Sequence, residues 1–430
     1  MSDTIFAAAT AAGKSGVAIV RVSGPNALQA ARSITGMTPV PRRAMLAMLS
    51  ARDGSTIDEA LVLYFENDKS FTGEPVVEFQ THGSGPVVSK LLSELELIEG
   101  LRIAEPGEFT RRALLNGQMD LAQVEGLADL IEAETEAQRL QAQRVFSGEL
   151  GKLVEEWRTK LICAAALIEA TIDFADEEVP VDVAPEVSEL LIDVRGQLRE
   201  HEQGTKTAER IRDGFEVAIV GPPNVGKSTL LNSIAGRDAA LTSEYAGTTR
   251  DFIEVRMDLE GLPVTFLDTA GLRESDDHVE ALGIERARTR ADRADVRVFL
   301  VERAGAEPEL KPKREDLVLV SKADLGDVEG PSVSGKSGQG VPELLKRIGA
   351  ILASRASSAG LSTRERHRLA LTQAIGALES ALVEVKSGPD RADLAAEEIR
   401  TALRALETLL GRVHVESLLD EIFSSFCIGK

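Results

Sequence analysis

Residues 221–228 have the types and spacing that bind phosphate. Their sequence, Gly-Pro-Pro-Asn-Val-Gly-Lys-Ser, matches the phosphate-binding loop pattern G-x-x-x-x-G-K-[ST] at every fixed position. The two glycines allow the backbone to curl so that successive N–H groups point at phosphate oxygens. Lys227 can reach the β- and γ-phosphates, and the hydroxyl of Ser228 can ligate Mg²⁺. The loop therefore predicts a site for a nucleoside triphosphate and Mg²⁺.

Two later segments have the residues of loops that sense the γ-phosphate. Residues 246–251 read Ala-Gly-Thr-Thr-Arg-Asp, and we expect Thr249 to join Mg²⁺ as in the first switch of a GTPase. Residues 263–271 are an apolar run ending in Asp-Thr-Ala-Gly, where Asp268 can hold Mg²⁺ through water and the N–H of Gly271 can sense the γ-phosphate. The alternative is that Asp-Thr-Ala-Gly forms an ordinary turn. The segment lies about forty residues after the phosphate loop, which favours the nucleotide role.

Base selection is expected from residues 321–324, Ser-Lys-Ala-Asp, which follow an apolar run. Asp324 can accept hydrogen bonds from the N1–H and the exocyclic amine of guanine, a pair that adenine lacks, and the stem of Lys322 can cover the base. The usual motif begins with Asn. Because Ser321 is shorter and loses one bridging hydrogen bond, we expect guanine affinity to fall by roughly 1 kcal/mol.

The last of the five elements is residues 334–336, Ser-Gly-Lys, whose backbone N–H groups would approach the guanine carbonyl. Gly335 stands where Ala is more common. The order and spacing of all five elements predict a GTPase.

The catalytic groups differ from those of Ras-like proteins, which place a water-orienting glutamine after the Asp-x-x-Gly segment. Leu272 occupies that position and cannot form a hydrogen bond, so another group must orient the water. Glu274 and Glu280 are the candidates, and a solvated surface charge is the alternative for either. Asn224 could help to hold a monovalent cation against the phosphates, which would offset the developing charge.

The surrounding sequence predicts the elements that position these residues. A strand at 216–220 and a helix from 229 flank the phosphate loop. Residues 1 to 117 mix strand-like runs at 17–22, 59–65 and 76–79 with turns, which predicts an α+β domain. Helical spacing follows from residue 121 and returns near the C-terminus.

These patterns divide the chain into four parts: 1–117, 118–213, 214–353 and 354–430. The third part is the α/β nucleotide domain. The helical stretches on either side are each too thin to bury their own apolar face. We expect one helical domain interrupted by the nucleotide domain, with two separate helical domains as the alternative.

Composition excludes several classes of protein. The 430 residues are enough for about three domains, and the net charge of -21 argues against a protein that coats nucleic acid nonspecifically. The most apolar stretch, 161–171, contains Glu169 and is too short for a membrane span. The N-terminus lacks the basic region of a secretory signal, and two cysteines cannot form a disulfide framework. The sequence predicts a soluble cytoplasmic protein without membrane contact.

Four segments at the two ends of the chain, together with the nucleotide motifs, closely resemble the MnmE/TrmE family of tRNA-modification GTPases. The segments are residues 3–6, 16–24, 105–112 and the terminal 422–430, which ends in Cys-Ile-Gly-Lys. The resemblance covers essentially the whole length. It implies an N-terminal α+β domain that binds a tetrahydrofolate derivative (the 5-formyl or methylene form) and forms a homodimer. A helical domain interrupted by a P-loop, Ras-like GTPase domain would follow.

The resemblance also implies a folate site. Arg21 and Glu78 match folate-contacting positions, and Lys430 would approach the same pocket, whereas a family lysine aligns with Gln118. Arg21 suits the folate carboxylates and Glu78 the pterin N–H donors. A surface ion pair and a strand-edge carboxylate are the alternatives. Cys427 would lie near the folate and take part in modification, with a buried small hydrophobe as its alternative.

For the GTPase domain the resemblance implies that K⁺ is the catalytic cation, held by Asn224 with Ser243, Tyr245 and Thr248. It favours Glu280 over Glu274 as the water-orienting residue. The positions expected to contact GTP or its metal ions are Asn224, Val225, Gly226, Lys227, Ser228, Thr229, Ser243, Glu244, Tyr245, Ala246, Gly247, Thr248, Thr249, Asp268, Thr269, Ala270, Gly271, Lys322, Asp324, Ser334, Gly335 and Lys336.

The implied activity is GTP hydrolysis coupled to tRNA modification. With an FAD-bearing partner of the MnmG/GidA type, in a heterotetramer or larger complex, the protein would add an aminomethyl or carboxymethylaminomethyl group to carbon 5 of the wobble uridine of certain tRNAs. Folate would supply the one-carbon unit. A regulatory GTPase in ribosome assembly and a folate enzyme that uses GTP only as a switch are the alternatives.

Overall fold

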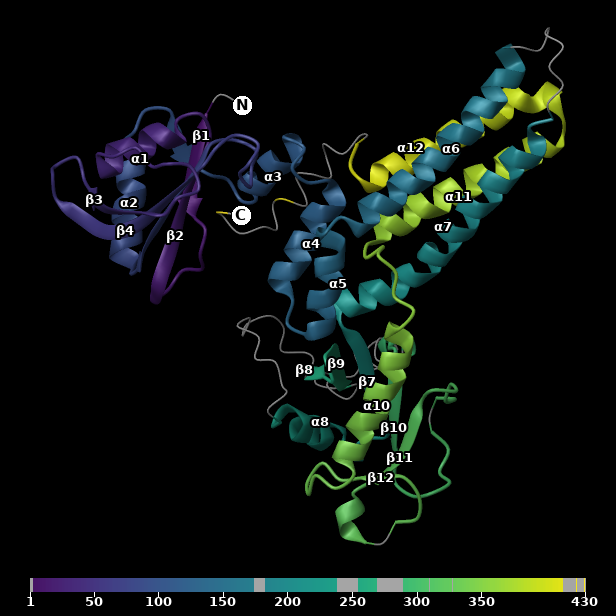
Figure 1. Cartoon of the computed structure of the whole chain (residues 1–430). Coiled ribbons are helices and arrows are strands. Elements are labelled where there is room, and N and C mark those ends of the chain that lie inside the picture. The colour runs from purple at the N-terminus through teal and green to yellow at the C-terminus, as the bar shows by residue number, and fades with distance from the viewer. Residues whose placement is uncertain are drawn as a thin grey trace, which may run out of the picture. The chain divides into compact units, whose positions relative to one another are not determined.

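The computed structural model describes residues 3–173, 182–237, 254–268, 289–308, 310–326, 328–412, 423 and 429. Contacts divide the chain into two compact units. The N-terminal unit comprises residues 1–128 and 407–430, and the central unit comprises residues 129–406. In Figure 1 the first is mostly purple and blue, and the second runs from blue through teal and green to yellow.

The N-terminal unit is built on a six-stranded sheet of order β3-β4-β5-β2-β1-β6. Its strands are β1 (Thr4–Ala8), β2 (Ser15–Ser23), β3 (Met45–Ser50), β4 (Thr56–Phe65), β5 (Val76–Gly83) and β6 (Leu101–Ile103). The strands expected at 17–22, 59–65 and 76–79 lie within β2, β4 and β5 and are confirmed.

Helices cover the two faces of this sheet unequally. On one face, α1 (Ala27–Thr35) and α2 (Gly85–Glu96) pack with Phe6, Val20 and Phe79 in one apolar cluster. Side chains alternate along a strand, so the neighbours of Phe6 in β1 join a second cluster on the other face. That cluster includes Phe109 of α3 (Glu108–Leu115). The helix α4 (Leu121–Glu132) follows α3.

The central unit contains a helical bundle and an α/β domain. The bundle helices are α5 (Glu136–Phe146), α6 (Glu149–Asp173), α7 (Ala184–Asp213), α11 (Glu365–Lys386) and α12 (Ala392–Leu409). Helices from both sides of the α/β domain pack together, as Figure 1 shows: Arg199 of α7 pairs with Glu379 of α11. Arg400 of α12 lies 3.6 Å from Glu169 of α6. One interrupted helical domain is therefore confirmed, and two separate helical domains are excluded.

The α/β domain has a six-stranded sheet of order β12-β11-β10-β7-β9-β8, parallel except for β8. Its elements are β7 (Phe215–Val220), α8 (Lys227–Ala235), β8 (Glu254–Leu259), β9 (Leu262–Asp268), β10 (Val296–Val301), β11 (Leu317–Ser321), the short helix η1 (Ala323–Leu325), β12 (Ser332–Val333) and α10 (Val341–Ala356). The carboxyl ends of β7, β9 and β11 carry the predicted motifs. In open α/β sheets ligands bind at that edge.

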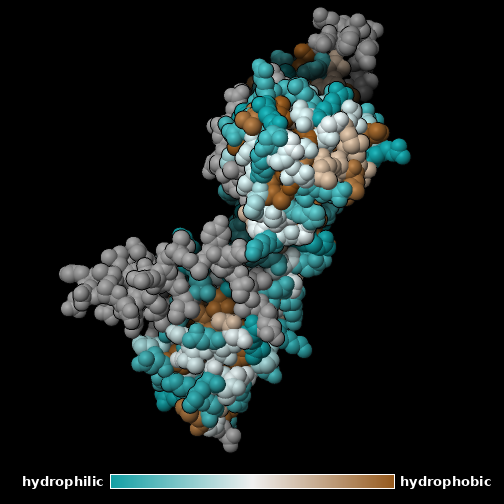
Figure 2. Space-filling model, turned by 90° about the vertical axis from the view of Figure 1, so that its left-hand side faces the viewer, coloured by the Kyte–Doolittle hydropathy of each residue, from teal (hydrophilic) through white to brown (hydrophobic). Residues whose placement is uncertain are grey.

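On the face shown in Figure 2 the described residues present mainly polar side chains, with hydrophobic side chains in small groups. Among the helices in the described ranges, none combines the length and the apolar character needed to cross a bilayer.

Candidate nucleotide-binding site

The loop from β7 to α8 has the backbone conformation that its residue types predict. Gly226 has φ 106°, which only glycine adopts freely, and Asn224 has φ 59°, which asparagine tolerates better than most residues. Gly221 is required by space, since a Cβ atom there would lie 2.5 Å from the carbonyl oxygen of Leu300 in β10. The loop is thus fixed close to the sheet edge.

Lys227 is the first residue of α8 and is 6% exposed. Its Nζ atom donates hydrogen bonds to the carbonyl oxygens of Gly221 and Pro222, each 2.8 Å away. The ammonium group is therefore held inside the loop, next to the N-terminus of α8 with its partial positive charge. This arrangement concentrates positive charge where a phosphate would enter.

Ser228 and Asp268 meet beside this loop. The hydroxyl of Ser228 donates a hydrogen bond of 2.5 Å to Oδ2 of Asp268, which ends β9 and is 2% exposed. β9 pairs with β7 in parallel, with Asp268 opposite Ile219, so the sheet register brings the carboxylate to the loop. Two hard oxygen donors at this position fit Mg²⁺, which prefers carboxylate and hydroxyl ligands near phosphates.

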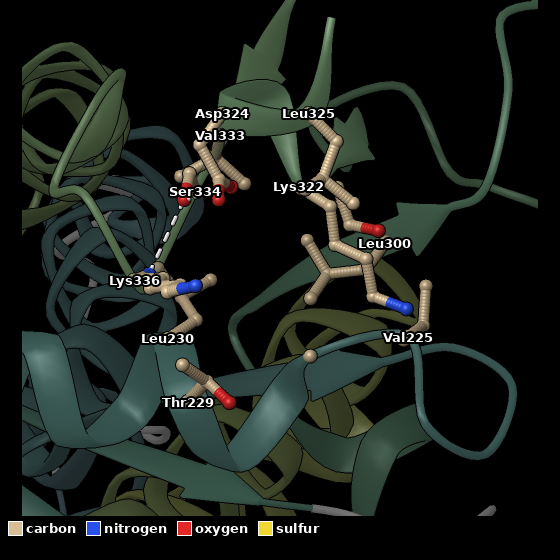
Figure 3. A pocket seen from close by; sticks show the side chains of 13 residues that line it. Val225, Thr229, Leu230, Leu300, Lys322, Asp324, Leu325, Val333, Ser334 and Lys336 are labelled. Atoms are coloured by element: carbon tan, nitrogen blue, oxygen red, sulfur yellow. Dashed lines mark hydrogen bonds between the residues drawn. The ribbon is translucent and has the colours of Figure 1, made fainter.

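A hollow of about 290 Å³ lies beyond the loop (Figure 3). Lys322 runs along one side of it, Ser334 and Lys336 lie on the opposite side, and Thr229 and Leu230 of α8 lie below (Figure 3). The hollow is thus enclosed by both segments that were expected to select the base.

The carboxylate of Asp324 is tied to the opposite segment. Its Oδ1 atom accepts a hydrogen bond of 2.6 Å from the hydroxyl of Ser334, and this bond is the main cause that holds the pKa of the Asp324 carboxyl below its ordinary value. The Ser334 hydroxyl in turn accepts bonds of 3.2 Å from the N–H groups of Lys336 and Ser337. Asp324 therefore stays ionised and can accept hydrogen bonds from a base.

The expected folate positions lie in the N-terminal unit, where Arg21 and Glu78 face each other on β2 and β5. The Nε atom of Arg21 is 2.9 Å from Oε1 of Glu78, and the two side chains are 20% and 15% exposed. The guanidinium carbon also lies 5.3 Å from the ring centroid of Phe71 and 5.7 Å from that of Phe109. The side chain of Gln118 packs close to Gly73, in the same loop as Phe71. Arg21 and Glu78 thus form an ion pair.

Two family models match the chain. The model described as GTP-binding protein TrmE N-terminus matches residues 4–118, and the model described as MnmE helical domain matches residues 121–427. Proteins called tRNA modification GTPase MnmE align over 100% of this chain and of their own length. Their identity is 59% over 430 residues in Roseobacter denitrificans, 59% over 429 in Ruegeria pomeroyi and 59% over 428 in Cereibacter sphaeroides.

The chain belongs to the MnmE family.

Two solved structures are similar to part of this MnmE-family chain. Aquifex aeolicus Era bound to GDP.AlF4- is 27% identical and covers 32% of this chain and 56% of its own, with a TM-score of 0.24. The G domain of the T. maritima FeoB iron transporter is 20% identical and covers 33% of this chain and 98% of its own, also with a TM-score of 0.24. These TM-scores are too low to support any statement about this chain.

Several positions singled out in the sequence lie outside the described residues. They are Ser243, Glu244, Tyr245, Ala246, Gly247, Thr248, Thr249, Thr269, Ala270, Gly271, Leu272, Glu274, Glu280, Cys427 and Lys430. The described residues bring the rest of the nucleotide set together around α8. Within the described ranges, no group of three or more His, Cys, Asp or Glu side chains could hold a metal ion.

The sequence analysis missed a buried ion cluster that borders the expected folate region of this MnmE-family chain. Arg112 of α3 is fully buried and bonds to Asp3, Glu74 and Glu108 at 3.0–3.3 Å. Glu74 also accepts a bond of 2.8 Å from Ser23 in β2. Part of this information was present in the sequence, because Glu108 and Arg112 are four residues apart, the spacing of an ion pair on a helix, in a segment that carries the family resemblance. Their burial was not visible from that spacing.

Proposed function

We propose that this chain is a K⁺-stimulated GTPase that acts in the cytoplasm on the wobble uridine of certain tRNAs, together with an FAD-bearing MnmG/GidA-type partner. Its membership of the MnmE family makes it a GTP hydrolase. The observation that carries the proposal is the hydrogen bond between Ser228 and Asp268 at the N-terminus of α8, close to the hollow that Asp324 lines. This arrangement occurs in a chain that is 59% identical over its whole length to a tRNA modification GTPase.

The chain's own residues account for nucleotide binding. Lys227 would exchange its two carbonyl contacts for phosphate oxygens, which are stronger, charged acceptors. Ser228 and Asp268 would hold Mg²⁺, which supplies charge neutralisation at the phosphates when bound. Asp324 would accept from guanine with its ionised carboxylate. Asn224, with K⁺, would hold positive charge against the phosphates, and Glu280 would orient the attacking water.

In the N-terminal unit we propose a folate site at the Arg21–Glu78 pair. A ligand with carboxylates and N–H donors would separate the pair, taking Arg21 with its carboxylates and Glu78 with its donors. Gln118 would contribute from the loop side, with Lys430 and Cys427 brought in from the C-terminus. The bound one-carbon unit would be the source of the added aminomethyl or carboxymethylaminomethyl group.

An exposed apolar row on the same sheet supports the proposed homodimer. Leu46 and Leu61 are paired across β3 and β4 and are 61% and 42% exposed, and Met48 on the same face is 49% exposed. Exposed apolar side chains of this size on a sheet face are costly in water unless a partner covers them.

The experiment is to digest total tRNA from cells with and without this gene and to analyse the nucleosides by mass spectrometry. We expect loss of the carbon-5 aminomethyl-type uridines, restored by the wild-type gene and not by Glu280→Ala. An unchanged profile in cells without a redundant enzyme would contradict the proposal, and co-sedimentation with ribosomal subunits would then support a role in ribosome assembly.

A further inference from the structure

Arg21 of β2 is held by two aromatic rings as well as by Glu78. Its guanidinium carbon lies 5.3 Å from the ring centroid of Phe71 and 5.7 Å from that of Phe109. At these distances the face of an aromatic ring attracts a cation. A free arginine side chain has many rotamers, and fixing one of them costs entropy. The two rings and the carboxylate of Glu78 therefore keep the guanidinium group in one place.

The two rings belong to segments that are separate in the chain. Phe109 lies in the first turn of α3, and Phe71 lies in the connection between β4 and β5. We call residues 70–74 the Phe71 loop. Both rings belong to the apolar cluster that includes Ile5 and Ala7 of β1. Apolar contacts are not directional, so polar contacts are needed to hold a loop and a helix in a fixed relation.

Arg112 and Glu74 supply that connection. Arg112 follows Phe109 by three residues on α3, and Glu74 follows Phe71 by three residues in the loop. The Nη1 atom of Arg112 donates to both carboxylate oxygens of Glu74, at 3.3 and 3.1 Å, while Nη2 donates to Glu108 on α3 at 3.0 Å. The planar guanidinium group has five N–H donors and can serve several acceptors at once. The fully buried Arg112 thus binds the Phe71 loop to α3.

Further hydrogen bonds tie the Phe71 loop to its neighbours. The hydroxyl of Ser23, which ends β2, donates to Glu74 at 2.8 Å and lies 2.7 Å from the hydroxyl of Thr72. Asn116, directly after α3, donates through its side chain to the carbonyl of Thr72 at 2.7 Å. The strand that carries Arg21, the loop and the helix are therefore joined around one buried ion pair.

We propose that Arg112 and Glu74 are positioning residues for the folate site: as a buried pair they hold Phe71 and Phe109 beside Arg21, and so keep its guanidinium group where a ligand carboxylate meets it. This inference rests on the proposed folate site. When a ligand separates Arg21 from Glu78, the two rings are the contacts that remain to fix the guanidinium group. A group that is ordered before binding loses less entropy on binding, which increases affinity.

Glu74→Gln tests the pair, because it keeps the size of the side chain and removes the charge opposite Arg112. In the full-length protein we expect about a tenfold loss of affinity for 5-formyltetrahydrofolate, measured by isothermal titration calorimetry. Arg102→Gln is the matched control. Arg102 bonds to Asp3, Glu108 and the carbonyl of Ile103, and within the described ranges it bonds to no residue of the Phe71 loop. It should therefore leave the affinity unchanged, and thermal unfolding of each variant checks the fold.

A double-mutant cycle separates positioning from a general effect on stability. In a Phe71→Leu background, where the ring is already absent, Glu74→Gln should have little further effect on folate affinity. Three results would overturn the proposal: an unchanged affinity in Glu74→Gln, the same fold loss with and without Phe71, or an equal loss in Arg102→Gln.

A second measurement reports on Arg21 without a ligand. Phenylglyoxal reacts with accessible arginine side chains, and mass spectrometry of the digested protein gives the extent of reaction at Arg21. We expect Arg21 to react faster in Glu74→Gln and in Phe71→Leu than in the wild-type protein, and at the wild-type rate in Arg102→Gln. An unchanged rate in Glu74→Gln would overturn the positioning role.

The two measurements also distinguish failure of this inference from failure of the folate site. If the wild-type protein does not bind 5-formyltetrahydrofolate, the proposed folate site has failed, and the reaction rate of Arg21 still decides whether the pair positions it. If Glu74→Gln does not fold, Arg112→Lys serves instead, since a lysine keeps the charge but cannot serve the acceptors on α3 and on the loop in the same way. It should raise the reaction rate of Arg21, and an unchanged rate would overturn the proposal.

Discussion

Asn224 stands in a backbone conformation that few side chains tolerate, and this bears on how its role can be tested. Its φ of 59° lies in the left-handed region, where a residue other than Gly, Asn or Asp costs about 1–2 kcal/mol. Asn224→Ala would therefore remove the amide and strain the loop together. Asn224→Gly removes the amide and keeps the conformation available.

We expect Asn224→Gly to hydrolyse GTP at the same rate in KCl and in NaCl at matched ionic strength, because the proposed cation ligand is lost. Nucleotide affinity should stay near that of the wild-type protein, whereas Asn224→Ala should weaken it as well. The measurement is steady-state phosphate release with a parallel GDP titration. An advantage of KCl that survives in Asn224→Gly would move the cation site elsewhere.

Glu108 gives a prediction about stability and pH. Burial alone would raise the pKa of its carboxyl, but hydrogen bonds from Arg102, the N–H of Glu105 and Arg112 outweigh burial and lower it. Because the folded pKa lies below the unfolded value of about 4.3, ionised Glu108 stabilises the fold above that pH. The contribution is lost as the pH falls through the folded pKa.

Glu108→Gln should lower the free energy of unfolding by about 3 kcal/mol at pH 7, since it leaves the buried Arg112 with one carboxylate fewer. The difference should shrink as the pH falls below the unfolded value of about 4.3 and through the folded pKa, because the wild-type carboxyl then becomes protonated as well. Urea unfolding at pH 7 and at a series of acidic pH values measures this. Glu136→Gln is the control: its partner Arg139 and its own side chain are about half exposed, so its change should be small. Equal losses in both variants would contradict the burial argument.

At the scale of elements, the two glycines of α7 should respond oppositely to alanine. A Cβ atom on Gly196 meets nothing within 4 Å, whereas one on Gly204 would lie 2.8 Å from the backbone N of Gly360, in the chain that leads from α10 to α11. Gly196→Ala should stabilise the protein by up to about 1 kcal/mol through helix propensity. Gly204→Ala should destabilise it despite the same gain. Thermal unfolding of both variants tests this prediction. Stabilisation by both substitutions would show that the backbone near Gly360 can move away from α7.

The sequence predicts where strands and helices lie better than it predicts how distant elements contact one another. The strands and helices around the phosphate loop follow from apolar runs, turns and a motif whose chemistry fixes its neighbours, so β7 and β9 end where expected and β11 ends one residue later, at Ser321. Helical spacing likewise predicts that the stretch after residue 121 is helical. The contact of Gly204 with Gly360 joins residues far apart in the chain, and no local pattern carries that information.

At the scale of the whole molecule, the interrupted helical domain was predictable because neither helical stretch can bury its own apolar face. The position of the two segments that connect the helical domain with the nucleotide domain was not predictable from the sequence. Arg212, near the end of α7, donates a bond of 2.6 Å to the carbonyl of Thr363, just before α11. Thr207 and Ser358 also approach to 3.4 Å through their hydroxyl oxygens. The entry to the nucleotide domain and the exit from it are therefore neighbours.

This proximity predicts that the nucleotide domain can be removed without unfolding the bundle. Asp213 is six residues beyond Thr207, or about 9 Å along the helix, so about four Gly and Ser residues can join it to Ser357. The large apolar cluster of the nucleotide domain lies within residues 215–352 apart from Ile211 and a few partly buried alanines at the junction. We expect the shortened chain to melt cooperatively with a helical circular dichroism spectrum, and a fragment of residues 211–359 to be stabilised against heat by GDP. A shortened chain without a cooperative transition would show that the bundle needs the inserted domain to fold.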